Sequence, residues 1–209
     1  MKHAWRKAEK SIYLPQEFPE IVHIPTYPYL SIKGVGDPNQ TDFQHRVEVL
    51  FSIAYGIKMA PRKGIVIDGY FEYTVYPLEG VWDYSDYAKQ NNVWGKEHLT
   101  YTLMIRQPAF VSDKLINQVI TLKQFDDADP RYNEVELIQQ EDGYCVQMMH
   151  AGSFDNELKS FAMMQTFIDR HQLIRHDKRH REIYLSDFRT TRAEQLKTVL
   201  RVSVESLKE

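Results

Sequence analysis

The segment His180-Arg-Glu-Ile-Tyr-Leu-Ser186 is a predicted strand with a carboxylate near its middle. Its side chains alternate between two faces with a period of two, as in a β-strand. Ile183 and Leu185 share the face that we expect to pack against helices. The opposite face carries His180, Glu182 and Tyr184. A carboxylate between a histidine and a tyrosine is a candidate ligand site, although the same pattern also fits an exposed glutamate on a solvated sheet.

The elements around this strand follow the order strand, helix, strand, strand. Residues 135–138 and 144–149 are predicted strands around a turn at Asp142-Gly143. Asp155 begins a predicted helix with an apolar face at helical spacing. That face consists of Leu158, Phe161, Met164, Phe167 and Ile168. After the strand at 180–185, Thr191 and Glu194 fit a capping box on a short turn, and residues 197–203 are the last predicted strand.

The first half of the chain has the same order of elements. Predicted strands at 21–24 and 29–32 precede a helix that begins at Thr41, with Gln44 completing a capping box, and runs to about Met59. The aromatic and β-branched segment 70–76 is a predicted strand that Pro77 ends. Another predicted strand covers 99–105, and Ser112 caps a linker helix.

This repeated order predicts an α+β fold of one domain over residues 1–209. Half one covers about 20–108, the linker helix about 111–124 and half two about 132–204. We expect helices on one sheet face and a ligand groove between the halves on the other. Residues 1–19 are polar and contain prolines, and they are predicted to form an arm lying on the domain.

Composition excludes several classes of protein. The chain is 43% hydrophobic and 26% charged, which is typical of a globular domain. A net charge of −3 without a basic stripe argues against direct nucleic-acid binding. No apolar stretch approaches the ~20 residues of a membrane helix. The single cysteine, Cys145, and the lack of an apolar segment after the charged N-terminus predict a cytoplasmic protein.

Three weaker signals predict neither a metal nor a cofactor. His171, His176 and His180 lack a cysteine or acid that would complete a metal site. Gly34 and Gly36 lack the third glycine of a dinucleotide loop and are predicted to form a turn. Cys145, within a strand, is better explained as a small core residue than as a nucleophile.

Several segments resemble GyrI-like small-molecule-binding proteins. They are Tyr73-Thr-Val-Tyr-Pro-Leu-Glu-Gly-Val-Trp82, Met104-Ile-Arg-Gln-Pro108, Val146-Gln-Met-Met-His150 with Gly152, Glu182-Ile-Tyr-Leu-Ser-Asp187 and Leu196-Lys-Thr-Val-Leu-Arg201. The resemblance runs from about Leu14 to Val202. More narrowly, these segments resemble the stand-alone branch known for cyclopropanoid cyclopropyl hydrolases. The resemblance implies tandem β-α-β-β modules related by a pseudo-two-fold axis.

The resemblance also implies roles for individual residues. Glu182 matches the ligand-contacting acid of the family, which often faces cationic or planar aromatic ligands. The aromatic walls would come from Trp82, Tyr73 and Tyr76. Further candidate ligand contacts are Glu79 and His180. The chain departs from the family at Phe154, where a tyrosine is expected after Gly152, which argues against a catalytic role for that position.

Two main functions are compatible with this set of residues, and a gyrase-inhibiting interaction protein is a third alternative. In the first, the protein hydrolyses the cyclopropane of planar DNA-alkylating compounds and so detoxifies them. Glu182 would then activate water, while Tyr184 or Tyr73 donates a hydrogen bond to the developing oxyanion. In the second, the protein binds planar or cationic drugs without chemistry, or senses a ligand through a partner. The sequence leaves the oligomeric state open.

Overall fold

The computed structural model describes residues 2–206, and the chain divides into two compact units. Unit 1 contains the described residues up to Ala4, then Tyr27–Leu78 and Asp83–Gln140. Unit 2 contains Trp5–Thr26, Glu79–Trp82 and the described residues from Glu141 onward. The two units therefore interleave along the chain.

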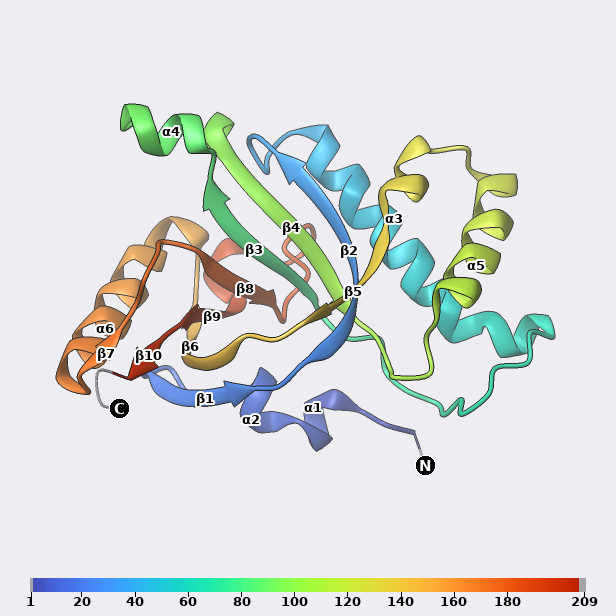
Figure 1. The fold of residues 1–209 in the computed structure, drawn as a ribbon, viewed down its shortest axis with the longest axis horizontal. Coiled ribbons are helices and arrows are strands. Elements are labelled where there is room, and N and C mark those ends of the chain that lie inside the picture. Colours follow the sequence, from blue (N-terminus) through green and yellow to red (C-terminus); the bar gives the residue numbers. More distant parts are fainter. Residues whose placement is uncertain (1, 207–209) are drawn as a thin grey trace. The chain divides into compact units, whose positions relative to one another are not determined.

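Strand β2 (Tyr27–Val35) is central to unit 1. It pairs antiparallel with β4 (Leu99–Arg106) on one side and with β5 (Glu136–Gln140) on the other. Helix α3 (Thr41–Met59) packs against β2, β4 and α5 (Asp113–Asp126) (Figure 1). The predicted strand at 99–105 and both predicted helices are therefore confirmed.

The strand predicted at 70–76 is wrong. Residues 70–77 form only an isolated bridge between His3 and Tyr73, and β3 instead covers Leu78–Tyr84. Residues 70–76 have a high β-propensity, but their aromatic rings are used in side-chain packing. The rings of Phe71 and Tyr73 both contact the ring of Phe110. Pro77 ends this extended segment and directly precedes the true strand. The β-propensity of residues 70–76 correctly indicated extended backbone, but it did not predict whether this segment pairs with another strand.

Short elements complete unit 1. They are η1 (Ala60–Lys63), α4 (Asp86–Asn91), η2 (Lys96–His98) and η3 (Pro130–Glu134). The predicted cap of α5 is confirmed, because the Ser112 hydroxyl accepts a hydrogen bond from the backbone N–H of Leu115. The predicted capping box at Thr41 is wrong, since Gln40 is the N-cap of α3 and makes no side-chain cap.

Antiparallel strands form the sheet of unit 2. Their order is β1 (Glu20–Ile24), β6 (Gly143–Ala151), β9 (Lys197–Ser203), β8 (His180–Tyr184) and then the unit 2 part of β3. Helix α6 (Glu157–Arg170), preceded by η4 (Phe154–Asn156), packs on β6. The remaining elements are β7 (Leu173–Ile174), η5 (Ala193–Gln195) and β10 (Glu205–Ser206), and β7 pairs with β10.

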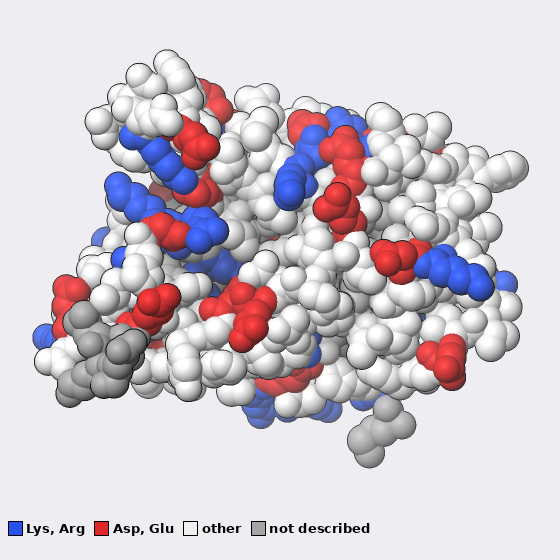
Figure 2. Space-filling model, in the orientation of Figure 1, with Lys and Arg blue, Asp and Glu red and all other residues white. Residues whose placement is uncertain are grey.

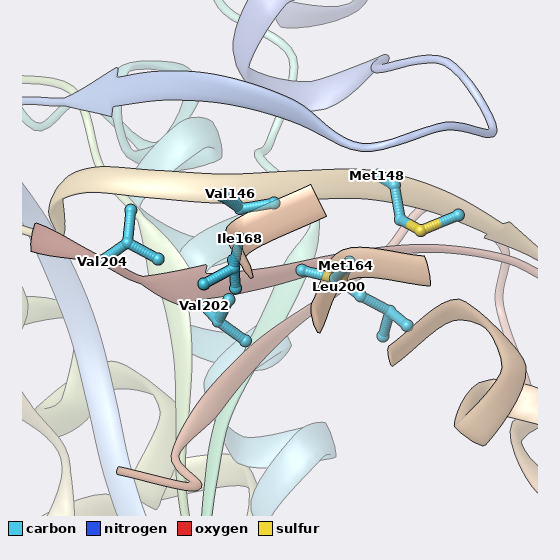
Figure 3. Packing of buried hydrophobic residues seen from close by; sticks show 7 residues of the cluster. All are labelled: Val146, Met148, Met164, Ile168, Leu200, Val202 and Val204. Atoms are coloured by element: carbon cyan, nitrogen blue, oxygen red, sulfur yellow. The ribbon is translucent and has the colours of Figure 1, made fainter. Parts of the chain in front are cut away.

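An apolar cluster holds α6 on this sheet. Met164 and Ile168 of α6 meet side chains of β6 and β9, as Figure 3 shows. The strand residues are Val146, Met148, Leu200 and Val202, followed by Val204. Burial of one such side chain contributes roughly 1.5–3 kcal/mol. Two predictions fail here: Leu158, expected on the apolar face of α6, is 79% exposed, and η5 has no side-chain cap from its N-cap Arg192.

The N-terminal arm packs against the opposite face of the unit 2 sheet. It contains α1 (Trp5–Ala8) and α2 (Lys10–Tyr13), whose buried rings Trp5 and Tyr13 contact each other. The guanidinium of Arg201 donates to the carbonyl oxygen of Ile12, and the amide of Gln147 donates to that of Ser11. These hydrogen bonds compensate for the cost of burying two polar side chains.

The α+β fold class is confirmed. The orders β2-α3-β3-β4 and β6-α6-β8-β9 reproduce the two predicted modules. Cys145 is completely buried, and burial raises the pKa of its thiol to about 11, which fits a core residue. No helix within residues 2–206 is long and apolar enough to cross a membrane. Acidic and basic side chains are interspersed on the face drawn in Figure 2.

Candidate functional site

Glu182 lies in the middle of β8 in unit 2 and is 8% exposed. Its cross-strand partner is Leu200, which belongs to the apolar cluster under α6. Directly opposed residues in an antiparallel pair share a face. Glu182 therefore lies on the same face as α6, whereas we predicted that Ile183 would face the helices. A period of two separates the faces but does not identify the helix that covers each one.

A directional chain of hydrogen bonds ends at Glu182. The indole Nε1 of Trp82 donates to the hydroxyl of Tyr184 at 2.9 Å. That hydroxyl donates to Oε2 of Glu182 at 2.8 Å. The direction is fixed because an indole N–H can only donate and a hydroxyl has a single proton. On the other side, Nε2 of His180 lies 3.1 Å from Oε1 of Glu182. Both carboxylate oxygens are thus held in place.

Tyr184 is a donor whose proton is tightly held. Burial raises the pKa of its hydroxyl well above the ordinary value of 10.0, and the negative charge of Glu182 adds to the increase. Both effects disfavour a phenolate. Its only proton is donated to Glu182, so in this geometry Tyr184 positions the carboxylate.

A second acid, Glu157, was not predicted from the sequence. It is the first residue of α6 and is 9% exposed. Burial, followed by the charge of Glu182, raises the pKa of Glu157 to about 9. The carboxyl is therefore protonated at neutral pH, and its Oε1 has no hydrogen-bond partner among the described residues. A polar or positively charged group of a ligand could bind to this Oε1 atom of Glu157.

Helical spacing is the signal in the sequence that could have revealed Glu157. The buried residues of α6 are Glu157, Ser160, Met164 and Ile168, at intervals of three and four. The two polar residues at the start of the helix therefore continue the apolar stripe that holds the helix on the sheet. An acid in line with a core stripe is buried, and a buried acid has a perturbed pKa.

Aromatic rings pack against Tyr184 and His180, the two residues that hydrogen-bond to Glu182. Phe154 and Phe188 meet the ring of Tyr184 edge-on, at centroid distances of 6.0 and 5.4 Å. Phe161 of α6 meets the ring of His180 at 4.9 Å. Apolar neighbours lower the local dielectric and strengthen interactions between charges and hydrogen-bonding groups. Phe154 is 36% exposed, so this ring without a hydroxyl group lies at the edge of the cluster.

Gly80 allows the indole and the phenol to approach each other. A Cβ atom at this position would lie 2.8 Å from Nε1 of Trp82 and 3.2 Å from the Tyr184 hydroxyl. Contacts below 3.0 Å essentially never occur for real Cβ atoms. A residue without a side chain is therefore required where β3 passes the hydrogen-bonded pair.

Glu79 lies on the other face of β3 from Gly80 and Trp82. It is 1% exposed, and its Oε2 pairs with Nη1 of Arg181 at 2.8 Å. Nη2 of Arg181 pairs in turn with Asp142 at 2.7 Å. Burial raises the pKa of Glu79, and the charge of Arg181 opposes that increase. The observed role of this carboxylate is a buried ion pair that joins β3 to β8.

Tyr73 and Tyr76 belong to unit 1, so the structure does not place them relative to Glu182. The ring of Tyr73 packs against Phe110, and the Tyr76 hydroxyl lies 3.2 Å from Nε2 of His3. A cavity of about 130 Å³ in this unit is lined by Tyr73 and six other residues. A second cavity of about 580 Å³ lies between residues 64–68 and the start of α5 and includes no predicted site residue.

The comparisons with known proteins agree with this fold. The family model for the GyrI-like small molecule binding domain matches residues 17–205. The chain belongs to the GyrI-like family. Three crystal structures provide further likenesses. Two are of a hydrolase from Listeria innocua, at 34% and 33% identity. They cover 98% and 97% of this chain and 100% of theirs, with TM-scores of 0.89 and 0.88.

A more distant likeness shows that the GyrI-like fold extends beyond these hydrolases. The C-terminal domain of EcmrR is 12% identical, with coverage of 93% of this chain and 99% of that domain and a TM-score of 0.54. At this identity the likeness concerns the fold alone. The comparison with curated proteins gives no match. This GyrI-like chain is thus a small-molecule-binding domain.

Proposed function

We propose that this GyrI-like domain binds planar, electrophilic small molecules at the cluster of Glu182, Tyr184, Trp82 and Glu157, and that it adds water to a strained ring in them. The substrate class is the cyclopropanoids, in which a cyclopropane is fused to a planar dienone. The observation that carries the proposal is a pair of buried carboxyl groups. Glu182 is held by two hydrogen bonds, and burial together with the charge of Glu182 raises the pKa of Glu157 to about 9.

The pair supplies a base and an acid for one addition. Glu182 accepts a proton from water as the water oxygen bonds to the cyclopropyl carbon. The cyclopropane C–C bond breaks, and its electron pair moves into the dienone to give a phenolate. Glu157 protonates the phenolate oxygen, so that the product is the substrate plus one water. Each carboxylate oxygen of Glu182 has two acceptor sites, so one remains beside each existing hydrogen bond.

One further observation and one chemical argument support hydrolysis. The Listeria innocua proteins of 33–34% identity, which this chain covers completely, are described as hydrolases. The reaction itself demands little, because the ring is already strained and positioning provides much of the rate. Tyr184 acts here by positioning Glu182, since its proton is already donated, and Tyr73 is not needed as the oxyanion donor.

A second candidate function is binding without chemistry. Two buried acids among aromatic rings also suit an organic cation, because a cation would compensate the charge of Glu182 and provide a partner for Glu157. In that case the protein sequesters planar or cationic drugs or works with a partner as a sensor. The ligand class overlaps with that of the hydrolase, and the two functions differ only in turnover.

Product formation distinguishes the two functions. The protein is incubated with a cyclopropane-bearing dienone alkylator, and the product with one added water is measured by mass spectrometry. Glu182→Gln should lower the rate about 10²–10⁴-fold, the usual contribution of a positioned base. Glu194→Gln, at an exposed position, is the matched control and should leave the rate unchanged.

The outcomes separate the proposals clearly. An unchanged rate in Glu182→Gln would remove Glu182 from the mechanism. If the wild type forms no product but binds the planar cation ethidium, and Glu182→Gln weakens that binding, the sequestering function replaces the hydrolase.

A further inference from the structure

A small cavity in unit 1 combines three basic side chains with a buried hydroxyl. Its volume is about 130 Å³. The basic residues are Lys2, Lys58 and Arg62, and the rest of the lining consists of Met59, Tyr70, Glu72 and Tyr73. Since one water takes about 30 Å³ in the liquid, the cavity has room for an ion with four oxygen atoms. Its lining has a formal net charge of +2, from three cations and one carboxylate.

Backbone pairing fixes one of these cations. The N–H of His3 donates to the carbonyl of Glu72 at 2.7 Å, and the N–H of Thr74 donates to the carbonyl of His3 at 2.8 Å. Residue 3 therefore lies beside Tyr73 as a bridge partner. Lys2 directly precedes this bridge. The backbone hydrogen bonds of His3 therefore hold Lys2 next to the cavity.

The other two cations come from the end of a helix. Lys58 lies in the last turn of α3, and Arg62 in the 3₁₀ turn that follows. Within residues 2–206, no ion pair is formed by Lys2, Lys58 or Arg62. The only acid in the lining, Glu72, is exposed. The three charges therefore remain available to a bound anion.

Tyr73 adds a buried hydroxyl group to the residues that line the cavity. It is 1% exposed, and its hydroxyl has no hydrogen-bond partner among the described residues. Leaving such a group unpaired costs roughly 1–3 kcal/mol, which a bound acceptor would recover. Burial raises the pKa of this hydroxyl above its usual range, with a smaller contribution from Tyr70, so it remains a donor.

We infer that this cavity binds a tetrahedral oxyanion, either inorganic phosphate or the phosphoryl group of a monoester, between Lys2, Lys58 and Arg62, with the Tyr73 hydroxyl as a neutral donor. Lysine and arginine are the usual partners of phosphate oxygens. The site is chemically opposite to the acidic cluster in unit 2, which suits neutral or cationic ligands. It represents a second ligand class and does not depend on the proposed hydrolysis.

The test is a titration of the full chain with inorganic phosphate at constant ionic strength. Binding is followed by the NMR shifts of the backbone amides of His3 and Thr74, which flank the cavity. We expect saturable shifts with phosphate and with phenyl phosphate, but none with the same concentration of chloride. Saturation by phenyl phosphate alone would assign the site to monoesters, and saturation by both would assign it to the phosphoryl group in general.

Matched variants test the residues. Arg62→Gln should weaken binding about tenfold, whereas Lys63→Gln, at the exposed next residue outside the lining, should not. Tyr73→Phe should also weaken binding, while Tyr70→Phe should not, because the Tyr70 hydroxyl already donates to the Lys58 carbonyl. No saturable shift in the wild type, or equal losses in Arg62→Gln and Lys63→Gln, would overturn the inference. Arg62 is exposed, so this comparison does not depend on a change in the core.

Discussion

Tyr184 donates its hydroxyl hydrogen to Oε2 of Glu182 over 2.8 Å, from a position two residues further along the same face of β8. One strand therefore carries both the acid and the group that orients it. The oxygen that donates to Glu182 also accepts from the indole of Trp82. Removing this oxygen affects both neighbours.

Tyr184→Phe should destabilise the protein and lower its activity. The change removes the oxygen that accepts from the buried indole N–H of Trp82, and the loss of a buried hydrogen bond of this kind costs roughly 1–3 kcal/mol. It also frees one oxygen of Glu182. Urea unfolding measures the free energy of unfolding, and Tyr87→Phe, at a ring that is 61% exposed, is the control. Equal free energies for the wild type and Tyr184→Phe would show that the hydrogen bond contributes nothing.

Substitutions of Trp82 distinguish a stacking wall from a hydrogen-bond donor. If ligands stack on the ring, Trp82→Ala should lose about tenfold or more in affinity, because stacking on an aromatic ring contributes ~1–3 kcal/mol. Trp82→Phe keeps a ring but loses the N–H that donates to Tyr184. A fluorescence titration with ethidium compares both variants with Trp94→Ala in unit 1. Wild-type affinity in Trp82→Ala would exclude Trp82 as a wall.

The stability of the protein should fall as the pH rises from about 5 to about 9 because of Glu157. The pKa of Glu157 is about 9 in the folded state, against an ordinary value of 4.5. Between these values the folded chain binds a proton that the unfolded chain has lost, so the free energy of unfolding decreases with pH. The contribution is complete below the unfolded pKa and is lost as the pH rises through the folded pKa.

Glu157→Gln provides the comparison for this pH dependence. The variant has no proton to lose, so its stability relative to the wild type should increase towards pH 9. Urea unfolding at several pH values measures the difference. A constant difference between the two proteins would mean that Glu157 does not retain its proton on folding. The hydrolytic rate should likewise fall as the pH rises through about 9, since the acid is then ionised.

Gly80→Ala should disturb the site without changing any polar group. The new methyl group would lie 2.8 Å from Nε1 of Trp82, so the indole or the strand has to shift. We expect weaker ligand binding and a lower free energy of unfolding, measured by titration and by urea. Val81→Ala, on the other face of the strand, is the control for a change in β3. Wild-type affinity in Gly80→Ala would show that the close approach is not needed for binding.

The sequence predicted the strand that carries Glu182 more accurately than the surroundings of that strand. Alternation placed His180, Glu182 and Tyr184 on one face, and their hydrogen bonds confirm it. Alternation does not predict how β8 aligns with β9, however. That alignment pairs Glu182 with Leu200 and so puts Glu182 on the face that α6 covers. Glu157 was missed for a related reason, because its burial depends on how α6 docks and an isolated acid at a helix start usually caps the helix.

The strand at 78–84 illustrates a different limit. Residues 70–76 have the higher β-propensity, yet they form only one bridge with the N-terminal segment. Strand formation requires a partner, and partners come from distant parts of the chain. The roles of Glu79 and Tyr73 likewise depend on partners that are distant in the sequence. Tyr73 forms its bridge with His3. Glu79 pairs with Arg181, 102 residues away, which no local pattern indicates.

Interleaving of the two units has a consequence for the gene. Unit 2 takes its residues from three separate stretches of chain, and Glu79–Trp82 is a four-residue insertion between two stretches of unit 1. A single cut in the coding sequence therefore cannot separate one intact unit from the other. The proposed ligand cluster draws on the second and third stretches, so exchanging these two stretches without the part of unit 1 between them would require three crossovers, one at each end of Glu79–Trp82 and one before Glu141. Any single contiguous piece that carries the whole cluster also carries residues 83–140 of unit 1, so the site is inherited together with a large part of the other unit.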